Sequence, residues 1–245
     1  MSTPLLLPSP RVEGFGYHSR ILFHWRADRM RITALGGETA TLTRASDATV
    51  DDSFGTSRTV GWHQSAWTTV NDAPALDLSR AAGARAADSL SWPFLAAPQT
   101  MTIYVRFVEN GTIGIADARV LSIGSAALAA PYLYVFSNGT VYRATHHNGS
   151  TAVTATMGSA PGLGARVELR VVLNANGSVA ISQSVNEGAE TATVTSSSAS
   201  LAGMWGGATL WLNGEAAATA GIGLYRTLKI AAGVRSLADC RGRLF

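Results

Sequence analysis

Apolar and polar residues alternate along the middle of the chain. Between residues 99 and 108, Met101, Ile103, Val105 and Phe107 share one side of an extended backbone, and the residues between them are mostly polar. Residues 165–173 repeat this spacing. A period of two predicts β-strands with one buried side, because successive side chains of a strand point to opposite faces.

Shorter runs of β-branched and aromatic residues, separated by Asn, Gly and Ser, predict further strands, and many short strands with tight turns predict an all-β antiparallel sandwich. Asn138 and Gly139 predict a two-residue type I′ hairpin turn, in which both residues have positive φ. One short helix is predicted at 236–243, with Ser236 as its N-cap and Asp239 near its N-terminus. The predicted strands are 39–44, 57–60, 89–92, 99–108, 132–137, 140–147, 151–157, 165–173, 178–185, 190–195, 208–212 and 221–231.

Residues 1–35 show neither a helical nor a strand period. Prolines at positions 4, 8 and 10 favour an extended backbone, and aromatic residues follow among several arginines. We therefore predict an extended N-terminal arm over residues 1–35, ahead of a sandwich domain over residues 36–245. The arm is expected to dock on the domain or on a neighbouring subunit through its aromatic and basic side chains: Arg11, Phe15, Tyr17, Arg20, Phe23, Trp25, Arg26, Arg29 and Arg31.

The composition supports a large core and a weakly charged surface. Of the 245 residues, 47% are hydrophobic and only 14% are charged, so Ser, Thr, Ala and Gly must supply much of the surface. So little charge favours a protein that is covered by neighbours, including copies of itself. The net charge of +3 is too small to indicate nucleic-acid binding.

Cys240 is the only cysteine, so an internal disulfide is excluded, and we expect it to be a small buried residue of the predicted helix. The N-terminal residues lack the basic segment of a signal peptide. The longest uncharged run, 120–142, contains Pro131 and several Gly and Ser residues and is not expected to span a membrane. We therefore expect folding in a reducing cytosol, without membrane contact.

Acidic residues and histidines do not form a recognisable catalytic or metal-binding arrangement. Glu187 and Glu190 are the closest acidic pair beyond residue 95, but they fall near a predicted turn, where solvated charges are expected. His146 and His147 would point to opposite faces of a strand, so both cannot bind one metal ion. These residues therefore favour a protein without a catalytic centre.

Known sequence motifs point the same way. The chain contains no nucleophile elbow, P-loop or dinucleotide fingerprint. Asp51 and Asp52 are the best candidate calcium ligands, and a turn explains them equally well. We predict no catalytic residue, cofactor or metal, and no enzyme activity. Trp205, in a Gly-rich segment, is a candidate to stack on a sugar or to anchor an interface, whereas Trp211 on a strand is expected to pack in the core.

Three stretches together resemble the laminin-G/concanavalin A-like jelly-roll domains of tailed-phage structural proteins: residues 100–107 followed by 119–124, residues 132–139, and residues 221–226 through 235–239. Leu237 and Asp239 match the closing Leu-x-Asp helix of that family, and Cys240 replaces the Glu that usually follows. Upstream, residues 43–51 with 58–60 are similar to a segment that often precedes this domain in phage tail and surface proteins.

The resemblance implies an antiparallel jelly-roll sandwich in a non-enzymatic structural protein of a tailed-phage virion. In this interpretation the arm anchors the chain to other virion proteins and to copies of itself. The jelly roll is displayed on the particle surface, as capsid decoration or as a tail protein, after synthesis in the host cytoplasm. Because one fold serves many functions, two alternatives stay open. One is a carbohydrate-binding module for host-surface glycans, using Trp205 or a sheet face; the other is a glycosidase.

Overall fold

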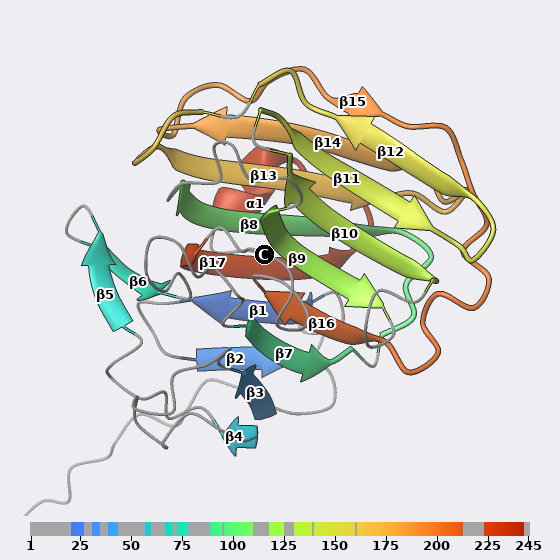
Figure 1. The fold of residues 1–245 in the computed structure, drawn as a ribbon, viewed down its shortest axis with the longest axis horizontal. Helices are drawn as coiled ribbons and strands as arrows, with labels where there is room; N and C mark the ends of the chain where they lie inside the picture. Colours follow the sequence, from blue (N-terminus) through green and yellow to red (C-terminus); the bar gives the residue numbers. More distant parts are fainter. Residues whose placement is uncertain are drawn as a thin grey trace, which may run out of the picture.

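The computed structural model describes residues 21–26, 31–34, 39–43, 57–59, 67–70, 73–77, 89–94, 96–109, 118–124, 130–138, 140–159, 161–212 and 223–242. Up to residue 93 the description covers the backbone of the strands, and beyond that residue it includes side chains. Within these ranges the chain forms two antiparallel sheets and one short helix (Figure 1). The elements are β1 (Ile21–Arg26), β2 (Arg31–Ala34), β3 (Thr39–Thr43), β4 (Ser57–Thr59), β5 (Trp67–Val70), β6 (Ala73–Asp77), β7 (Ser89–Pro93), β8 (Met101–Glu109), β9 (Ala118–Gly124), β10 (Tyr132–Ser137), β11 (Tyr142–His147), β12 (Ala152–Thr156), β13 (Arg166–Leu173), β14 (Val179–Val185), β15 (Val194–Thr195), β16 (Thr209–Leu212), β17 (Gly223–Ala232) and α1 (Leu237–Arg241).

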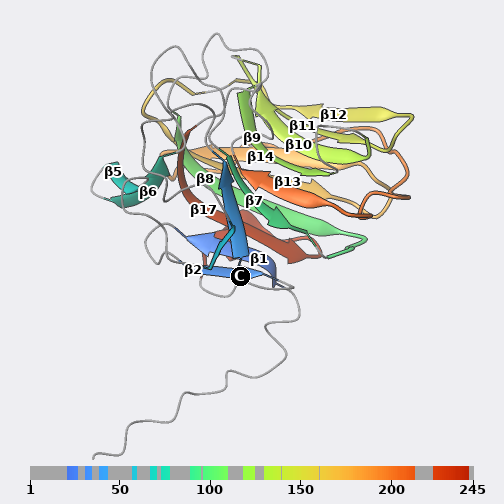
Figure 2. The same cartoon turned by 60° about the horizontal axis from the view of Figure 1, so that its bottom comes forward.

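The two sheets pack face to face as the layers of a sandwich (Figure 2). In the described part of the chain, one sheet has nine strands, in the order β15-β14-β13-β8-β17-β1-β2, and β6 pairs with both β17 and β5. The other sheet has eight, in the order β12-β11-β10-β9-β16-β7-β3-β4. Strands distant in sequence, such as β8 and β17, are neighbours in the sheet. The predicted all-β antiparallel sandwich is confirmed.

The core lies between the two sheets and follows the alternation of the sequence. On β8, Met101, Ile103 and Phe107 are fully buried on the side that faces the other sheet. Leu133 and Val135 on β10 meet them from the opposite layer and are also fully buried. The burial of these apolar side chains is the main contribution to the stability of the two packed sheets.

The outer side of β8 is buried as well, although a half-buried strand was predicted. Thr102 is fully buried and Tyr104 is 3% exposed, because α1 packs across this part of the nine-stranded sheet. Tyr104, Ala231, Leu237 and Cys240 form a second apolar cluster there. The period of two identified the inner face, but it could not show that a distant helix covers the outer one.

α1 is held at both ends. Ser236 Oγ accepts a hydrogen bond from the Asp239 backbone N–H at 3.1 Å, and Asp239 Oδ2 accepts one from the Ser236 backbone N–H at 3.1 Å. At the other end, Lys229 Nζ donates to the carbonyl oxygens of Cys240 and Gly242 at 2.7 and 3.1 Å, where a cation also suits the helix dipole. The predicted capped helix and the buried Cys240 are confirmed.

The turn between β10 and β11 differs from the prediction. Residues 138–141 connect the strands, and Asn138 is not among the described non-glycine residues with positive φ. Instead, Asn138 Oδ1 accepts hydrogen bonds from the backbone N–H groups of Thr140 and Val141 at 3.2 and 3.0 Å. The predicted two-residue type I′ turn is therefore wrong, because the Asn side chain closes a longer turn of its own.

The described parts of residues 1–35 are strands of the nine-stranded sheet. β1 pairs with β17, placing Phe23 opposite Ile230 and Trp25 opposite Leu228, and β2 pairs with β1. The sequence shows no strand period here, yet residues 21–26 and 31–34 are strands of the sheet. The edge of β17 supplies backbone partners that a local pattern cannot reveal. The domain boundary at residue 35 stays a prediction.

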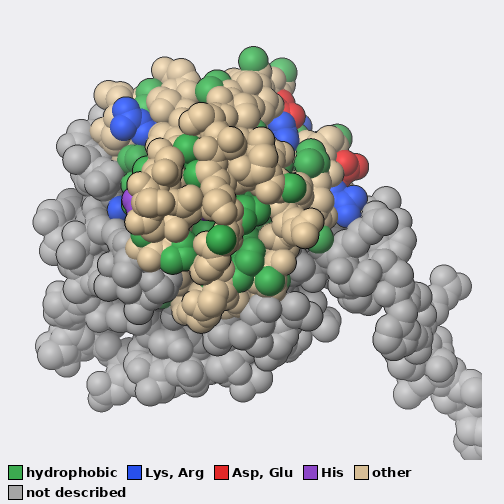
Figure 3. Space-filling model, turned by 90° about the vertical axis from the view of Figure 1, so that its right-hand side faces the viewer, with side chains coloured by type: hydrophobic (Ala, Val, Ile, Leu, Met, Phe, Trp, Pro, Cys, Tyr) green, Lys and Arg blue, Asp and Glu red, His purple; other side chains and the backbone are tan. Residues whose placement is uncertain are grey.

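The described surface carries little charge. Figure 3 views one end of the sandwich, where the described side chains are mainly uncharged, with hydrophobic groups among polar ones. This matches the low charged fraction of the sequence. None of the helices in the described ranges has the length and hydropathy of a membrane span.

Candidate functional site

The outer face of the eight-stranded sheet carries three aromatic rings on β10. Tyr132, Tyr134 and Phe136 alternate with the core residues Leu133 and Val135, so the rings point away from the core. The ring centroids of Tyr132 and Tyr134 are 4.8 Å apart, and those of Tyr134 and Phe136 are also 4.8 Å apart. Tyr132 and Tyr134 are half-buried, and Phe136 is 5% exposed. We call these three residues the aromatic row.

Two arginines flank the Phe136 end of the aromatic row. The strand register places Arg119 of β9 on one side of Phe136 and Arg143 of β11 on the other. Arg119 Cζ lies 3.9 Å from the Tyr134 ring centroid, a cation–π contact. Arg119 is 4% exposed, yet its Nε and Nη1 atoms are buried without a hydrogen-bond partner, and so is Nε of Arg143.

The Tyr132 end of the row is closely packed. The His147 ring on β11 stacks on the Tyr132 ring with 5.2 Å between centroids. On the other side, Gly124 of β9 pairs with Tyr132, and a Cβ at position 124 would lie 2.8 Å from the Tyr132 Cβ. Glycine is therefore needed for β9 to approach β10 this closely beside the ring.

Ser122 and Trp211 lie beside the middle of the row. Ser122 of β9 pairs with Tyr134 on one side and with Trp211 of β16 on the other. Its Oγ atom is buried without a hydrogen-bond partner. Trp211 is half-buried on the outer face, because Leu210 and Leu212 occupy the core. The prediction that Trp211 packs in the core is wrong: a one-residue shift in alternation reverses the face that a side chain occupies.

The face combines flat apolar surface with unused hydrogen-bonding capacity. Tyrosine rings offer an apolar body with a polar tip, and guanidinium groups offer several donors in a fixed fork. A saccharide has the matching character, since its ring has apolar C–H faces and a rim of hydroxyl groups. The arrangement is suited to binding such a ligand, and it lacks an acid–base pair of its own among the described residues.

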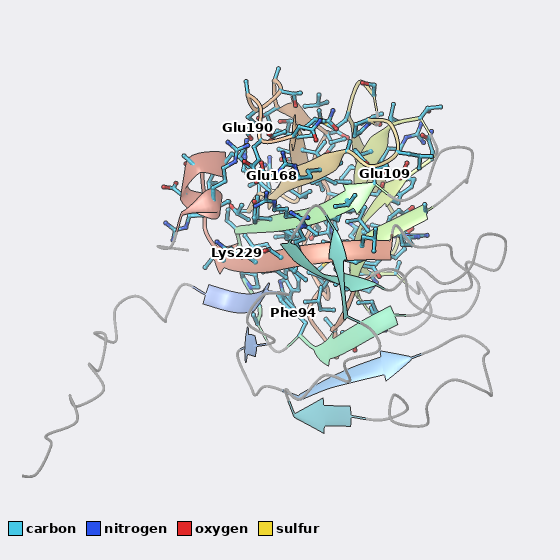
Figure 4. All side chains as sticks on the ribbon, turned by 90° about the vertical axis from the view of Figure 1, so that its left-hand side faces the viewer. Phe94, Glu109, Glu168, Glu190 and Lys229 are labelled. Carbon is cyan, nitrogen blue, oxygen red and sulfur yellow. The ribbon has the colours of Figure 1, made fainter. Side chains whose placement is uncertain are left out.

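The outer face of the nine-stranded sheet is different, because its carboxylates are paired. Glu168, 2% exposed, accepts hydrogen bonds from Tyr104 Oη at 2.5 Å and from Arg241 Nε and Nη2 at 2.9 and 2.5 Å. Burial alone would raise the pKa of Glu168, but the hydrogen bonds from Arg241 and Tyr104 outweigh it and lower that pKa below its ordinary value. Figure 4 shows Glu168 on the side of the sheet near α1. This arrangement fastens α1 to the sheet.

The candidate catalytic acids lie on this same paired face. Glu187, exposed in the turn after β14, pairs with Arg106 and, at 3.5 Å, with Arg166. Glu190 is half-buried and accepts a hydrogen bond from Arg170 Nε at 2.6 Å. Both acids are therefore held in ion pairs with arginines. Glu187 is an exposed charge in a turn, as predicted. Glu190 was expected to be solvated as well, but it is half-buried.

The two adjacent histidines point to opposite faces, as predicted. His146 is fully buried, with Nδ1 2.9 Å from the Gly177 carbonyl oxygen and Nε2 without a partner. Burial lowers the pKa of His146 below its ordinary value. Within the described ranges, His, Cys, Asp and Glu nowhere form a group of three that could hold a metal ion. Asp51 and Asp52 lie outside the described residues.

Trp205 is half-buried in the turn at 202–207. Its ring lies 5.6 Å from the Phe94 ring and packs against the core. Among the described residues, no ring contact joins it to the aromatic row. Of the predicted assembly contacts, four lie in β1 and β2, where only the backbone is described, and the others lie outside the described residues. The first group is Phe23, Trp25, Arg26 and Arg31, and the second is Arg11, Phe15, Tyr17, Arg20 and Arg29.

No protein-family model and no curated protein matches the chain in sequence. Solved structures do match its fold. The binding domain of botulinum neurotoxin serotype D/C is similar with a TM-score of 0.56 and 11% identity, over 91% of this chain and 51% of that one. A structure of botulinum neurotoxin type C, whose cell entry is dependent upon interaction with two ganglioside molecules, matches with a TM-score of 0.55 and 10% identity, over 91% of this chain and 50% of that one.

A third match is the enzymatically active domain of tailspike protein 2 from bacteriophage CBA120, with a TM-score of 0.50 and 14% identity, over 71% of this chain and 28% of that one. The chain is a concanavalin-like jelly-roll sandwich. At these identities the likeness is one of fold. The chain spans about half of the two neurotoxin structures.

The aromatic row was not identified from the sequence, although a signal was present. Tyr132, Tyr134 and Phe136 recur every second residue, and aliphatic residues fill the gaps. A strand that is apolar on both faces within an antiparallel sheet indicates that its outer face is covered or binds something. The arginines gave no such signal, because the register that places them beside Phe136 is long-range.

Proposed function

We propose that this chain is a non-enzymatic carbohydrate-binding jelly-roll domain, which binds a saccharide on the outer face of the eight-stranded sheet. The aromatic row supports this proposal most directly. Its two half-buried tyrosines pack on each other with ring centroids 4.8 Å apart, and each offers an apolar ring with a polar tip to a ligand. Pre-positioned rings bind at low entropic cost, because packing on their neighbours already restricts them.

The fold comparisons are consistent with a recognition role. Botulinum neurotoxin type C interacts with two ganglioside molecules for cell entry, and the tailspike domain belongs to a phage protein. The pairing of Glu187 and Glu190 with arginines supports a domain without glycosidase activity. The saccharide would be held by ring stacking and hydroxyl hydrogen bonds, without cofactor or metal.

A glycan array with the purified chain tests the proposal. We expect binding by the wild type and about a tenfold or greater loss of affinity in Tyr134→Ala, since removal of a central aromatic contact commonly costs that much. Leu163→Ala is the matched control, because Leu163 is 65% exposed and belongs to the turn before β13. Trp205→Ala tests whether the saccharide binds at the aromatic row or at Trp205 in the turn at 202–207. An array on which the wild type binds nothing refutes the proposed function.

The setting in a tailed-phage particle is a second proposal, supported by the motif resemblance and by the tailspike match over 71% of this chain. In it, residues ahead of β1 anchor the chain to copies of itself and to other virion proteins. Deleting residues 1–20 keeps β1 in the sheet. We expect the full chain to form oligomers by light scattering and the shortened chain to be monomeric. Identical masses for the two would refute the anchoring role.

A further inference from the structure

Arg119 and Arg143, on either side of Phe136, have no counter-charge in the described part of the chain. Neither makes an ion pair or a hydrogen bond with a carboxylate among the described residues. By contrast, four arginines on the side of the nine-stranded sheet each pair with a glutamate: Arg106, Arg166 and Arg170 of the sheet and Arg241 of α1.

The guanidinium of Arg119 lacks hydrogen-bond acceptors for two of its nitrogen atoms. The residue is 4% exposed, and both Nε and Nη1 of its guanidinium are buried without an acceptor. A buried cation without an acceptor is costly, and the contact with the Tyr134 ring 3.9 Å away offsets only part of that cost. Buried donors in this condition are satisfied by an anion or a hydroxyl that binds among them.

The second arginine lies within reach of the same point. Arg119 and Arg143 occupy strands on either side of Phe136, so their backbones are about 10 Å apart, twice the strand spacing. Both side chains are on the outer face, and Arg143 is half-buried, so it also faces solvent. Two arginines on either side of one phenylalanine offer N–H donors to a flat or tetrahedral oxyanion, which accepts paired N–H···O bonds.

We propose that the saccharide bound on this face is acidic, and that Arg119 and Arg143 bind its carboxylate or sulfate group at the Phe136 end of the aromatic row. This inference rests on the proposed function, because the sugar ring itself lies on Tyr132 and Tyr134. The tyrosines supply affinity for the sugar ring, and the arginines favour an acidic saccharide over its neutral counterpart.

The test uses one array that carries each saccharide in neutral, carboxylated and sulfated form. We expect the wild type to bind at least one acidic form about tenfold or more tightly than its neutral counterpart, as for a charge-assisted hydrogen bond. Raising the salt concentration from about 0.05 to about 0.5 M should weaken this preference, because salt screens charge. The carboxylated and sulfated arms distinguish the two anions.

Arg119→Gln and Arg143→Gln should each abolish the preference, so that each variant binds the acidic form no more tightly than its neutral counterpart. Arg166→Gln is the matched control, since it removes the same charge from the other sheet. The Arg119 side chain makes no hydrogen bond among the described residues, so Arg119→Gln leaves no former partner unsatisfied and is expected to fold. If it does not fold, Arg143→Gln alone carries the test. Equal binding of neutral and acidic forms overturns this inference and leaves the proposed function standing. Binding of neither refutes the proposed function itself.

Discussion

Replacing Glu168 by glutamine is expected to loosen α1 from the nine-stranded sheet before the sandwich unfolds. The Glu168 carboxylate accepts three hydrogen bonds, from Tyr104 and twice from Arg241. Breaking a buried ion pair costs about 3–5 kcal/mol, but the Arg241 side chain is 36% exposed and can turn into solvent. We therefore expect a cost of about 2–3 kcal/mol, discounted for that exposure.

Cys240 provides the assay for this change. It is the only cysteine of the chain. It lies in α1 with its side chain fully buried, and burial raises the pKa of its thiol to about 12. A thiol reagent can therefore modify it only when the helix opens. A cost of about 2–3 kcal/mol corresponds to labelling that is about 30 to 150 times faster in Glu168→Gln, with the far-ultraviolet circular dichroism of the sheets retained.

Glu187→Gln is the matched control, since Glu187 is 51% exposed and exposed pairs contribute less than about 1 kcal/mol. Acid should reproduce the effect in the wild type. The pKa of Glu168 is lowered in the folded state, so its stabilisation is complete above the ordinary value of 4.5 and is lost as pH falls through the folded-state pKa. If Glu168→Gln labels no faster than Glu187→Gln, the ion pair does not fasten the helix.

Two further expectations concern the fold. The pKa of His146 is lowered from 6.5 by burial. Its contribution to stability is therefore complete above about pH 6.5 and declines as pH falls below that value. In urea unfolding between about pH 7 and 5, His146→Gln should lose this decline and His147→Gln should keep it. Gly177→Ala should destabilise the sandwich by about 3 kcal/mol or more, because φ is +74° and the new Cβ would lie 1.5 Å from the Ala199 carbonyl oxygen. Gly203→Ala, at φ +76° with no atom within 4 Å, should cost about 1 kcal/mol. Equal urea midpoints for the two alanine variants would contradict the steric reasoning, and parallel pH profiles for the two histidine variants would contradict the assignment to His146.

Local pattern was enough to predict most strands and the helix. The alternation from Met101 to Phe107 identified an inner face that is fully buried, and Ser236 with Asp239 identified the helix cap. These features depend on residues within one strand or one turn of each other, so period and side-chain chemistry determine them directly. The same holds for the opposite orientation of His146 and its neighbour.

Tertiary structure alone decided which outer faces are covered and which side chains meet. β1 joins the sheet through β17, about 200 residues later in the chain by the pairing of residue 23 with residue 230. Arg119 meets Phe136 only through the register of β9 on β10, and a shift of one residue would turn that arginine into the core. Strand pairing is non-local, and its register follows from the packing of the whole sandwich, so a linear pattern cannot specify it.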